Sequence, residues 1–136
     1  MMLAATILFA GHAEAQDLST DPKDYPRMKE IMDTRYPDLT WEVHTVYADD
    51  GYIVPIYRVW DKKTRDSSKG PVAFQHGGGM DGAFWMQYMP DVTTQMQLVE
   101  DGHEVWLANS RGTEYATAHK TLDRLANPAE YWDFSW

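Results

Sequence analysis

Hydrophobic and polar residues alternate along two neighbouring stretches of the chain, 41–47 and 52–60, as they do in paired β-strands. Asp49-Asp50-Gly51 separates the two stretches, so the pattern predicts a β-hairpin. Pro55 stands inside the second stretch and has no N–H for a ladder hydrogen bond. We therefore expect the second strand to be an edge strand or to be bulged at this proline.

A short amphipathic helix is predicted upstream of the hairpin, because Met28, Ile31 and Met32 recur at helical spacing between Pro26 and Pro37. The helical spacing places these three apolar side chains on one face. We expect them to pack in the core.

Two short apolar runs downstream, 72–74 and 104–108, have the length of buried parallel strands. The segment 90–101 between them predicts a helix, and Gly102 stands where a C-terminal cap is expected. The order of strand, loop, helix and strand predicts a βαβ unit. The fold class predicted from the pattern is therefore α/β, with a β-hairpin followed by a βαβ unit.

Composition narrows the classes of function. A length of 136 residues with 43% hydrophobic content suits one domain with a core. Twelve basic against 21 acidic residues give a net charge of −9, which argues against nucleic acid and anionic membrane surfaces as partners. The chain has no cysteine, so disulfides, cysteine zinc sites and thiol catalysis are excluded.

Residues 1–15 predict a signal peptide, because an apolar run is followed by Ala13-Glu14-Ala15, a small-x-small pattern. No Lys or Arg precedes the run, so a ragged gene start is the alternative. The run is far shorter than the ~20 residues of a membrane-spanning helix, and no transmembrane helix is predicted. Residues 16–27 form a polar leader, and 28–136 form the folded portion. We expect a secreted or lumenal, including lysosomal, location.

A histidine and three glycines, His76-Gly77-Gly78-Gly79, directly follow the first apolar run. Glycines let backbone N–H groups point together at one developing negative charge, as they do in an oxyanion hole. The alternative is a tight strand-to-helix turn without a ligand. This loop is the main candidate for chemistry.

Two other templates fit less well. Gly77-x-Gly79-x-x-Gly82 resembles a dinucleotide-binding turn, but Ala108-Asn109-Ser110 stands where the ribose-binding acid is expected. His103-Glu104 begins like a zinc-protease signature, yet Leu107 occupies the place of the second histidine. We therefore predict neither a metal nor a cofactor. The remaining histidines are expected to be structural: His12 lies in the leader, His44 on a strand surface and His119 in a loop.

A serine nucleophile is not recognisable, because no Gly-x-Ser-x-Gly elbow occurs between residues 1 and 136. Ser110 lacks the glycine neighbours of such an elbow. We interpret Ser110 and Arg111 as structural residues that act through loop hydrogen bonding and an ion pair.

Six motifs occur in a fixed order in the folded portion of the chain. They are Trp41-Glu42-Val43-His44-Thr45-Val46, Asp50-Gly51-Tyr52-Ile53, Gly70-Pro71-Val72, Gln75-His76-Gly77, Val105-Trp106-Leu107-Ala108-Asn109-Ser110-Arg111-Gly112 and Tyr131-Trp132-Asp133-Phe134-Ser135-Trp136. This set resembles the acid lipase family, which includes gastric, lysosomal and plant neutral-lipid lipases. The resemblance implies the N-terminal part of an α/β-hydrolase fold with an incomplete sheet. It also implies a serine carboxylic-ester hydrolase whose substrates are neutral lipid esters, such as acylglycerols or steryl esters.

The resemblance further implies roles within the glycine loop. Gly78 stands where relatives carry a leucine whose backbone N–H forms half of the oxyanion hole, and Gly79 is the candidate second donor. His76 and Gly77 would shape the loop. The catalytic serine, acid and base would lie beyond Trp136, so this chain alone is expected to be inactive and to leave a bare apolar edge at the 72–74 strand. The alternative is a short, non-catalytic lipid-binding or interaction remnant.

Overall fold

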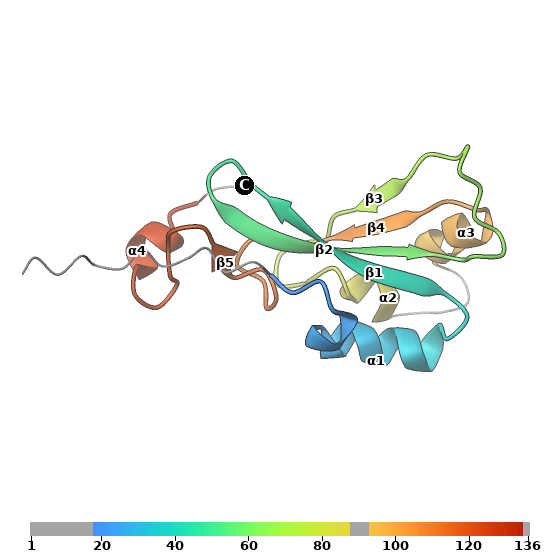
Figure 1. Ribbon diagram of the computed structural model, residues 1–136, viewed down its shortest axis with the longest axis horizontal. Coiled ribbons are helices and arrows are strands. Elements are labelled where there is room, and N and C mark those ends of the chain that lie inside the picture. The colour runs from blue at the N-terminus through green and yellow to red at the C-terminus, as the bar shows by residue number, and fades with distance from the viewer. Residues whose placement is uncertain (1–17, 88–92, 135–136) are drawn as a thin grey trace, which may run out of the picture.

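The computed structural model describes residues 18–87 and 93–134, which form a mixed α/β fold around a sheet (Figure 1). The sheet has the strand order β1-β2-β4-β3, and β5 pairs with the first residues of β2. The predicted α/β class is confirmed. The elements in chain order are η1 (Pro22–Asp24), α1 (Pro26–Arg35), β1 (Thr40–Tyr47), β2 (Tyr52–Trp60), β3 (Val72–Phe74), α2 (Phe84–Gln87), α3 (Thr94–Glu100), β4 (Val105–Ala108), β5 (Ala118–His119) and α4 (Pro128–Tyr131).

The N-terminal part of the described chain packs on the rest of the domain, since Tyr25 belongs to the core cluster. The predicted polar leader, 16–27, overlaps η1 and the first two residues of α1, and Tyr25 between them is only 3% exposed. The predicted signal peptide, 1–15, lies outside the described residues. Within the two described ranges, no helix combines the length and the apolar character needed to cross a membrane.

The predicted hairpin is confirmed. β1 and β2 pair as antiparallel strands from Thr40↔Trp60 to Tyr47↔Ile53. The turn places Gly51 at a φ of 98°, a left-handed conformation that strongly favours glycine.

Pro55 lies inside β2, which is an interior strand, so the prediction of an edge strand or a bulge is wrong. β1 pairs with β2 without interruption through Thr45↔Pro55. On the other side of β2, the β4 ladder stops at Ile56 and the β5 ladder at Ile53, so Pro55 falls in the gap between them. Its carbonyl faces this gap and accepts a hydrogen bond from Asn109 Nδ2 at 2.9 Å. Because the N and the C=O of a strand residue point to the same side, the missing N–H costs no ladder bond.

The predicted βαβ unit is confirmed. β3 and β4 are parallel neighbours, with Val72 opposite Val105 and Phe74 opposite Leu107, and α2 and α3 lie in the connection between them (Figure 1). Of the helix predicted over 90–101, the structure describes α3, while residues 90–92 lie outside the described residues.

Gly102 ends α3, as the sequence predicts. Its φ is 97°, and its N–H donates to Val99 O at 3.0 Å while the N–H of His103 donates to Leu98 O at 2.9 Å. These two bonds form a Schellman motif, which needs a left-handed residue at this position.

The prediction that the 72–74 strand is buried is wrong. Ala73 is exposed, and Val72 and Phe74 are half-buried. Among the described strands β3 pairs only with β4, so it forms one edge of the sheet. An edge strand leaves part of its backbone N–H and C=O groups without a ladder partner, which agrees with the expected free edge at this strand.

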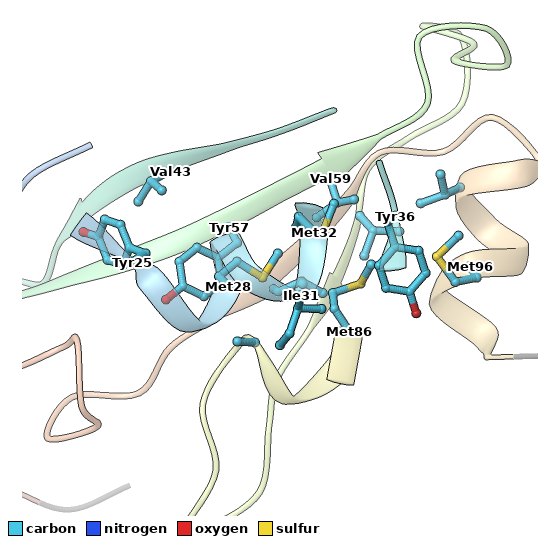
Figure 2. Close-up of a cluster of buried hydrophobic side chains, with 14 residues drawn as sticks. Tyr25, Met28, Ile31, Met32, Tyr36, Val43, Tyr57, Val59, Met86 and Met96 are labelled. Atoms are coloured by element: carbon cyan, nitrogen blue, oxygen red, sulfur yellow. The ribbon is translucent and has the colours of Figure 1, made fainter. Parts of the chain in front are cut away.

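The core lies between α1 and one face of the sheet, and Figure 2 shows its side chains. The three residues that helical spacing predicts for the core are buried: Met28 is 0%, Ile31 8% and Met32 2% exposed. They belong to one cluster with Tyr57 and Val59 of β2, which are both 0% exposed. The methionines are therefore core residues, as expected.

The opposite face of the sheet carries an ion-pair network centred on Arg58. The guanidinium donates to Glu42 at 2.5 Å and to Glu104 at 2.5 and 3.0 Å. It also lies 4.6 Å from the ring centroid of Trp60 and 5.5 Å from that of Trp106. The hydrogen bonds from Arg58 hold the pKa of both carboxyl groups below the ordinary glutamate value.

Replacing Met28 by alanine is expected to reduce the free energy of unfolding by about 2–5 kcal/mol, because it opens a cavity in the packed core. Urea denaturation measures this loss. The matched control is Met80→Ala, since Met80 is 39% exposed and its truncation should change the stability by less than about 0.5 kcal/mol. Equal losses for the two variants would contradict the described core.

Stability is expected to fall as the pH drops below about 5, because the pKa values of Glu42 and Glu104 are lowered in the folded state. A lowered pKa contributes stability above the unfolded pKa, and this contribution is lost as the pH falls through the folded pKa. Arg58→Met should make this acid-side loss shallower in urea midpoints measured from pH 7 to pH 3. Lys62→Met is the control, because Lys62 is exposed and pairs with no carboxylate among the described residues. If the urea midpoint of Arg58→Met fell as steeply with pH as that of the wild type, the result would argue against the network.

Candidate functional site

The loop of residues 75–83, called the glycine loop below, joins β3 to α2. It starts where the carboxyl ends of the parallel strands β3 and β4 lie side by side. The residues that follow β4, 109–111, leave the sheet at the same edge. In α/β folds, ligands bind at this edge of the sheet.

His76 anchors the first end of the glycine loop. It is 6% exposed, and its Nε2 accepts a hydrogen bond from the backbone N–H of Ser110 at 3.1 Å. Its Nδ1 lies 2.8 Å from the carbonyl oxygen of Gly77. A ring that accepts at Nε2 and donates at Nδ1 is the neutral tautomer with its proton on Nδ1. Beside it, Gln75 Nε2 donates to Ser110 Oγ at 2.8 Å, so two contacts join the loop to the end of β4.

Asn109 anchors the other end of the loop. Its Oδ1 accepts the N–H of Gly82 at 2.8 Å, while its Nδ2 donates to Pro55 O at 2.9 Å. Gly82 lies so close to the sheet that a Cβ there would be 3.0 Å from Leu107 O and 3.1 Å from Ala108 O. Glycine is therefore needed at this position for the close approach of the loop to the strand.

A buried carboxylate next to Gly82 makes a third anchor. Asp81 is 3% exposed, and its Oδ2 accepts from Arg27 of α1 at 2.8 Å. Its Oδ1 accepts the backbone N–H of Phe84, the first residue of α2, at 3.1 Å. The carboxylate thus links the loop to α1 and to the start of α2.

Between the anchors, the loop is exposed and makes few contacts. Gly77, Gly78, Gly79 and Met80 are all exposed, and a Cβ added at any of the three glycines would meet nothing within 4 Å. Gly79 has a φ of 76°, which turns the chain back toward Asp81. The N–H groups of residues 77–81 donate to no acceptor among the described residues. Four of these consecutive donors, at residues 77–80, belong to exposed residues and are therefore open to a ligand.

These donors line a cleft of about 620 Å³. The cleft is lined by residues 76–81 of the glycine loop, by Arg27, Phe84 and Gln87, and by residues 111–114. Tyr57 supports the loop from the core side, since its Cδ2 would be 3.2 Å from a Cβ at Gly82. Burial raises the pKa of Tyr57 well above its ordinary value, so its hydroxyl stays neutral at physiological pH.

The other sequence-predicted residues make contacts around the glycine loop and on the sheet. Ser110 and Arg111 make the loop hydrogen bond and the ion pair predicted for them: Ser110 joins the glycine loop, and Arg111 pairs with Asp50 and lies 4.8 Å from the ring centroid of Tyr52. His44 lies on the surface of β1, as expected, and pairs with Glu42.

His119 does not lie in a loop, so that prediction is wrong. It belongs to the two-residue strand β5 because it pairs with Tyr52 of β2. Its Nδ1 accepts the N–H groups of Thr121 and Leu122 at 3.0 and 2.9 Å. Across the part of the chain that the structure describes, no three His, Asp or Glu side chains form a group that could hold a metal ion.

Sequence reasoning missed Asn109, Asp81 and Arg27 as residues that hold the site. Asn109 could have been found, because a polar residue that directly follows a buried strand lies at the ligand-binding edge of an α/β sheet. Arg27 and Asp81 are 54 positions apart. No local pattern links residues so far apart in the chain, so only the folded structure shows this pair.

The chain has lipase relatives, and the family match includes this loop. Residues 32–88 match a family described as a partial alpha/beta-hydrolase lipase region. The chain carries a partial α/β-hydrolase lipase region. This lipase region spans β1, β2, β3, the glycine loop and α2. The resemblance to lipases stated from the sequence motifs is confirmed.

Several curated lipases are similar to the chain. It is 38% identical over 93 residues to triacylglycerol lipase 1 of Arabidopsis thaliana, covering 68% of this chain and 23% of the relative. It is 32% identical over 131 residues to lipase member M of Mus musculus, covering 93% and 29%. It is 36% identical over 95 residues to lipase 1 of Drosophila melanogaster, covering 70% and 20%. The chain therefore spans less than a third of the length of these relatives.

Asn109→Asp is expected to reduce the free energy of unfolding by about 1–3 kcal/mol, because it replaces the donor to Pro55 O by an oxygen in a buried position. Urea denaturation at pH 7 measures the change. Asn127→Asp is the matched control, since within the described part of the chain the side chain of Asn127 hydrogen-bonds only through its Oδ1, which accepts the N–H of Asp123 at 3.2 Å. Asn127→Asp should keep wild-type stability. A stable Asn109→Asp variant would contradict the bridge.

Proposed function

We propose that this chain supplies the oxyanion loop and part of the sheet of a serine carboxylic-ester hydrolase that acts on neutral lipid esters. The observation that carries the proposal is the row of open N–H donors at residues 77–80, held between anchored ends at the carboxyl edge of parallel strands. Ester hydrolysis develops negative charge on the carbonyl oxygen in its transition state. Fixed backbone donors stabilise that charge without reorganising at the moment of reaction.

Gly78 is the proposed oxyanion donor, and Gly79 is the proposed second one. Both residues line the cleft, and neither N–H has an acceptor among the described residues. In this role His76 and Gly77 shape the loop. The ring of His76 is occupied by Ser110 and Gly77, which suits a loop-shaping residue better than a general base.

The substrate class rests on the relatives, all named as lipases. We propose acylglycerols or steryl esters as the neutral lipid partners. Because residues 1–136 contain no serine elbow, we propose that the nucleophile and its acid and base come from a part of the full-length protein outside this sequence. This chain alone would then be inactive. We also propose that residues 1–15 are a signal peptide that directs the protein to a secreted or lumenal compartment.

Gly78→Pro in the full-length protein is expected to lower kcat on a p-nitrophenyl acyl ester by about 10²–10³-fold, because proline removes one oxyanion donor. Gly78→Ala is the matched control at the same position. Alanine keeps the N–H, its Cβ would meet nothing within 4 Å, and the φ of Gly78 is not in the left-handed region. The alanine variant should retain kcat within a few-fold of wild type.

Two results would overturn the proposal. A full-length wild-type protein without activity on acyl esters would contradict the function itself. A Gly78→Pro variant as active as Gly78→Ala would contradict the assignment of the donor.

A further inference from the structure

Asp81 is an unusual residue for an exposed glycine loop, because its side chain is buried. The four residues before it are exposed, yet Asp81 is 3% exposed. A buried carboxylate is stable only if it is paired and hydrogen-bonded. Within the described residues its one ion pair is with Arg27, at 2.8 Å.

Arg27 does more than neutralise Asp81. It is the second residue of α1, and its Nη2 donates to Gln87 Oε1 at 2.5 Å while Nη1 holds Asp81. The guanidinium therefore contacts the residues on both sides of α2, one before the helix and one at its last position. A planar group with several fixed donors suits such a bridge.

The burial of α1 fixes the position of Arg27. Met28, next to Arg27, is 0% exposed in the core, and Figure 2 shows it within the cluster of buried side chains. The position of Arg27 is thus set by the core rather than by the loop. Because Arg27 holds Asp81, it fixes the point at which the chain re-enters the fold after Gly79.

We propose that Arg27 and Asp81 form a positioning pair that sets the geometry of the oxyanion donors at Gly78 and Gly79. The inference rests on the proposed function of the loop. Without Arg27, the carboxylate of Asp81 is buried and unpaired. The loop relieves this by moving Asp81 toward water, and Gly79, two residues earlier, moves with it. Small displacements of groups that stabilise a transition state are costly in rate.

The kinetic test uses Arg27→Met in the full-length protein. We expect kcat on a p-nitrophenyl acyl ester to fall by on the order of 10–100-fold with KM changed less than about threefold, because the donors act in the transition state. Arg27→Lys should recover part of the rate, since a lysine charge still pairs with Asp81. The double variant Arg27→Met with Asp81→Asn should be faster than Arg27→Met alone, because the unpaired buried charge is gone while the Oδ1 acceptor for Phe84 remains.

The matched control is Arg35→Met. Arg35 also belongs to α1 and donates to α2, through the carbonyl oxygen of Gln87, but it has no contact with the loop. This variant should keep the wild-type kcat. A loss in Arg35→Met as large as that in Arg27→Met would show that docking of α1 on α2, not the pair with Asp81, controls the rate, and would overturn the proposal.

Amide hydrogen exchange tests the same pair without relying on activity. In Arg27→Met, the N–H groups of Gly82 and Phe84 should exchange at least tenfold faster, because the displaced loop separates Gly82 from Asn109 Oδ1 and Phe84 from the Oδ1 and the carbonyl oxygen of Asp81. The N–H of Ser110, held by His76, should keep its rate. Unchanged exchange at Gly82 and Phe84 would overturn the positioning role, whatever the activity shows. Faster exchange in Arg27→Met, together with a wild-type protein that hydrolyses no ester, would support the pair and reject only the proposed function.

Discussion

The side-chain amide of Asn109 is the contact on which both the sheet and the glycine loop depend. It is 5% exposed, and it donates to Pro55 O in the interior strand β2 while accepting from Gly82 N–H in the loop. A group that donates at one end and accepts at the other is required here, which an amide provides and a carboxylate does not. One side chain thereby fills the gap beside the proline and fixes the loop against the sheet.

The order of the glycine loop comes from residues outside it. Ser110, Asn109 and Arg27 hold the loop at His76, Gly82 and Asp81, and all three holding contacts come from chain segments far away in sequence. The glycines between the anchors contribute accessible backbone and a reversal of the chain at Gly79. A loop built in this way can present N–H donors to a ligand while its ends stay fixed, which is the property that electrostatic stabilisation of a transition state requires.

Local patterns predicted most elements correctly. Alternating residues identified the hairpin, helical spacing identified α1 and its buried methionines, and Gly102 marked the end of α3. Pro55 and β3 were misjudged for related reasons. Proline in a strand suggests an edge, but whether a ladder faces its nitrogen depends on where β4 and β5 end. The apolar run of β3 suggests burial, but its exposure depends on which strands lie beside it.

The sequence by itself determined the α/β class, the order of the elements, the position of the glycine loop and the resemblance to lipases, because each of these is encoded in spacing along a continuous stretch of chain. Only the tertiary structure decided which groups hold the loop. Asn109 reaches Pro55 across 54 positions, and Arg27 reaches Asp81 across another 54. Contacts of this kind depend on how strands and helices pack in space, and a buried polar group finds its partner wherever the fold brings one within hydrogen-bonding distance.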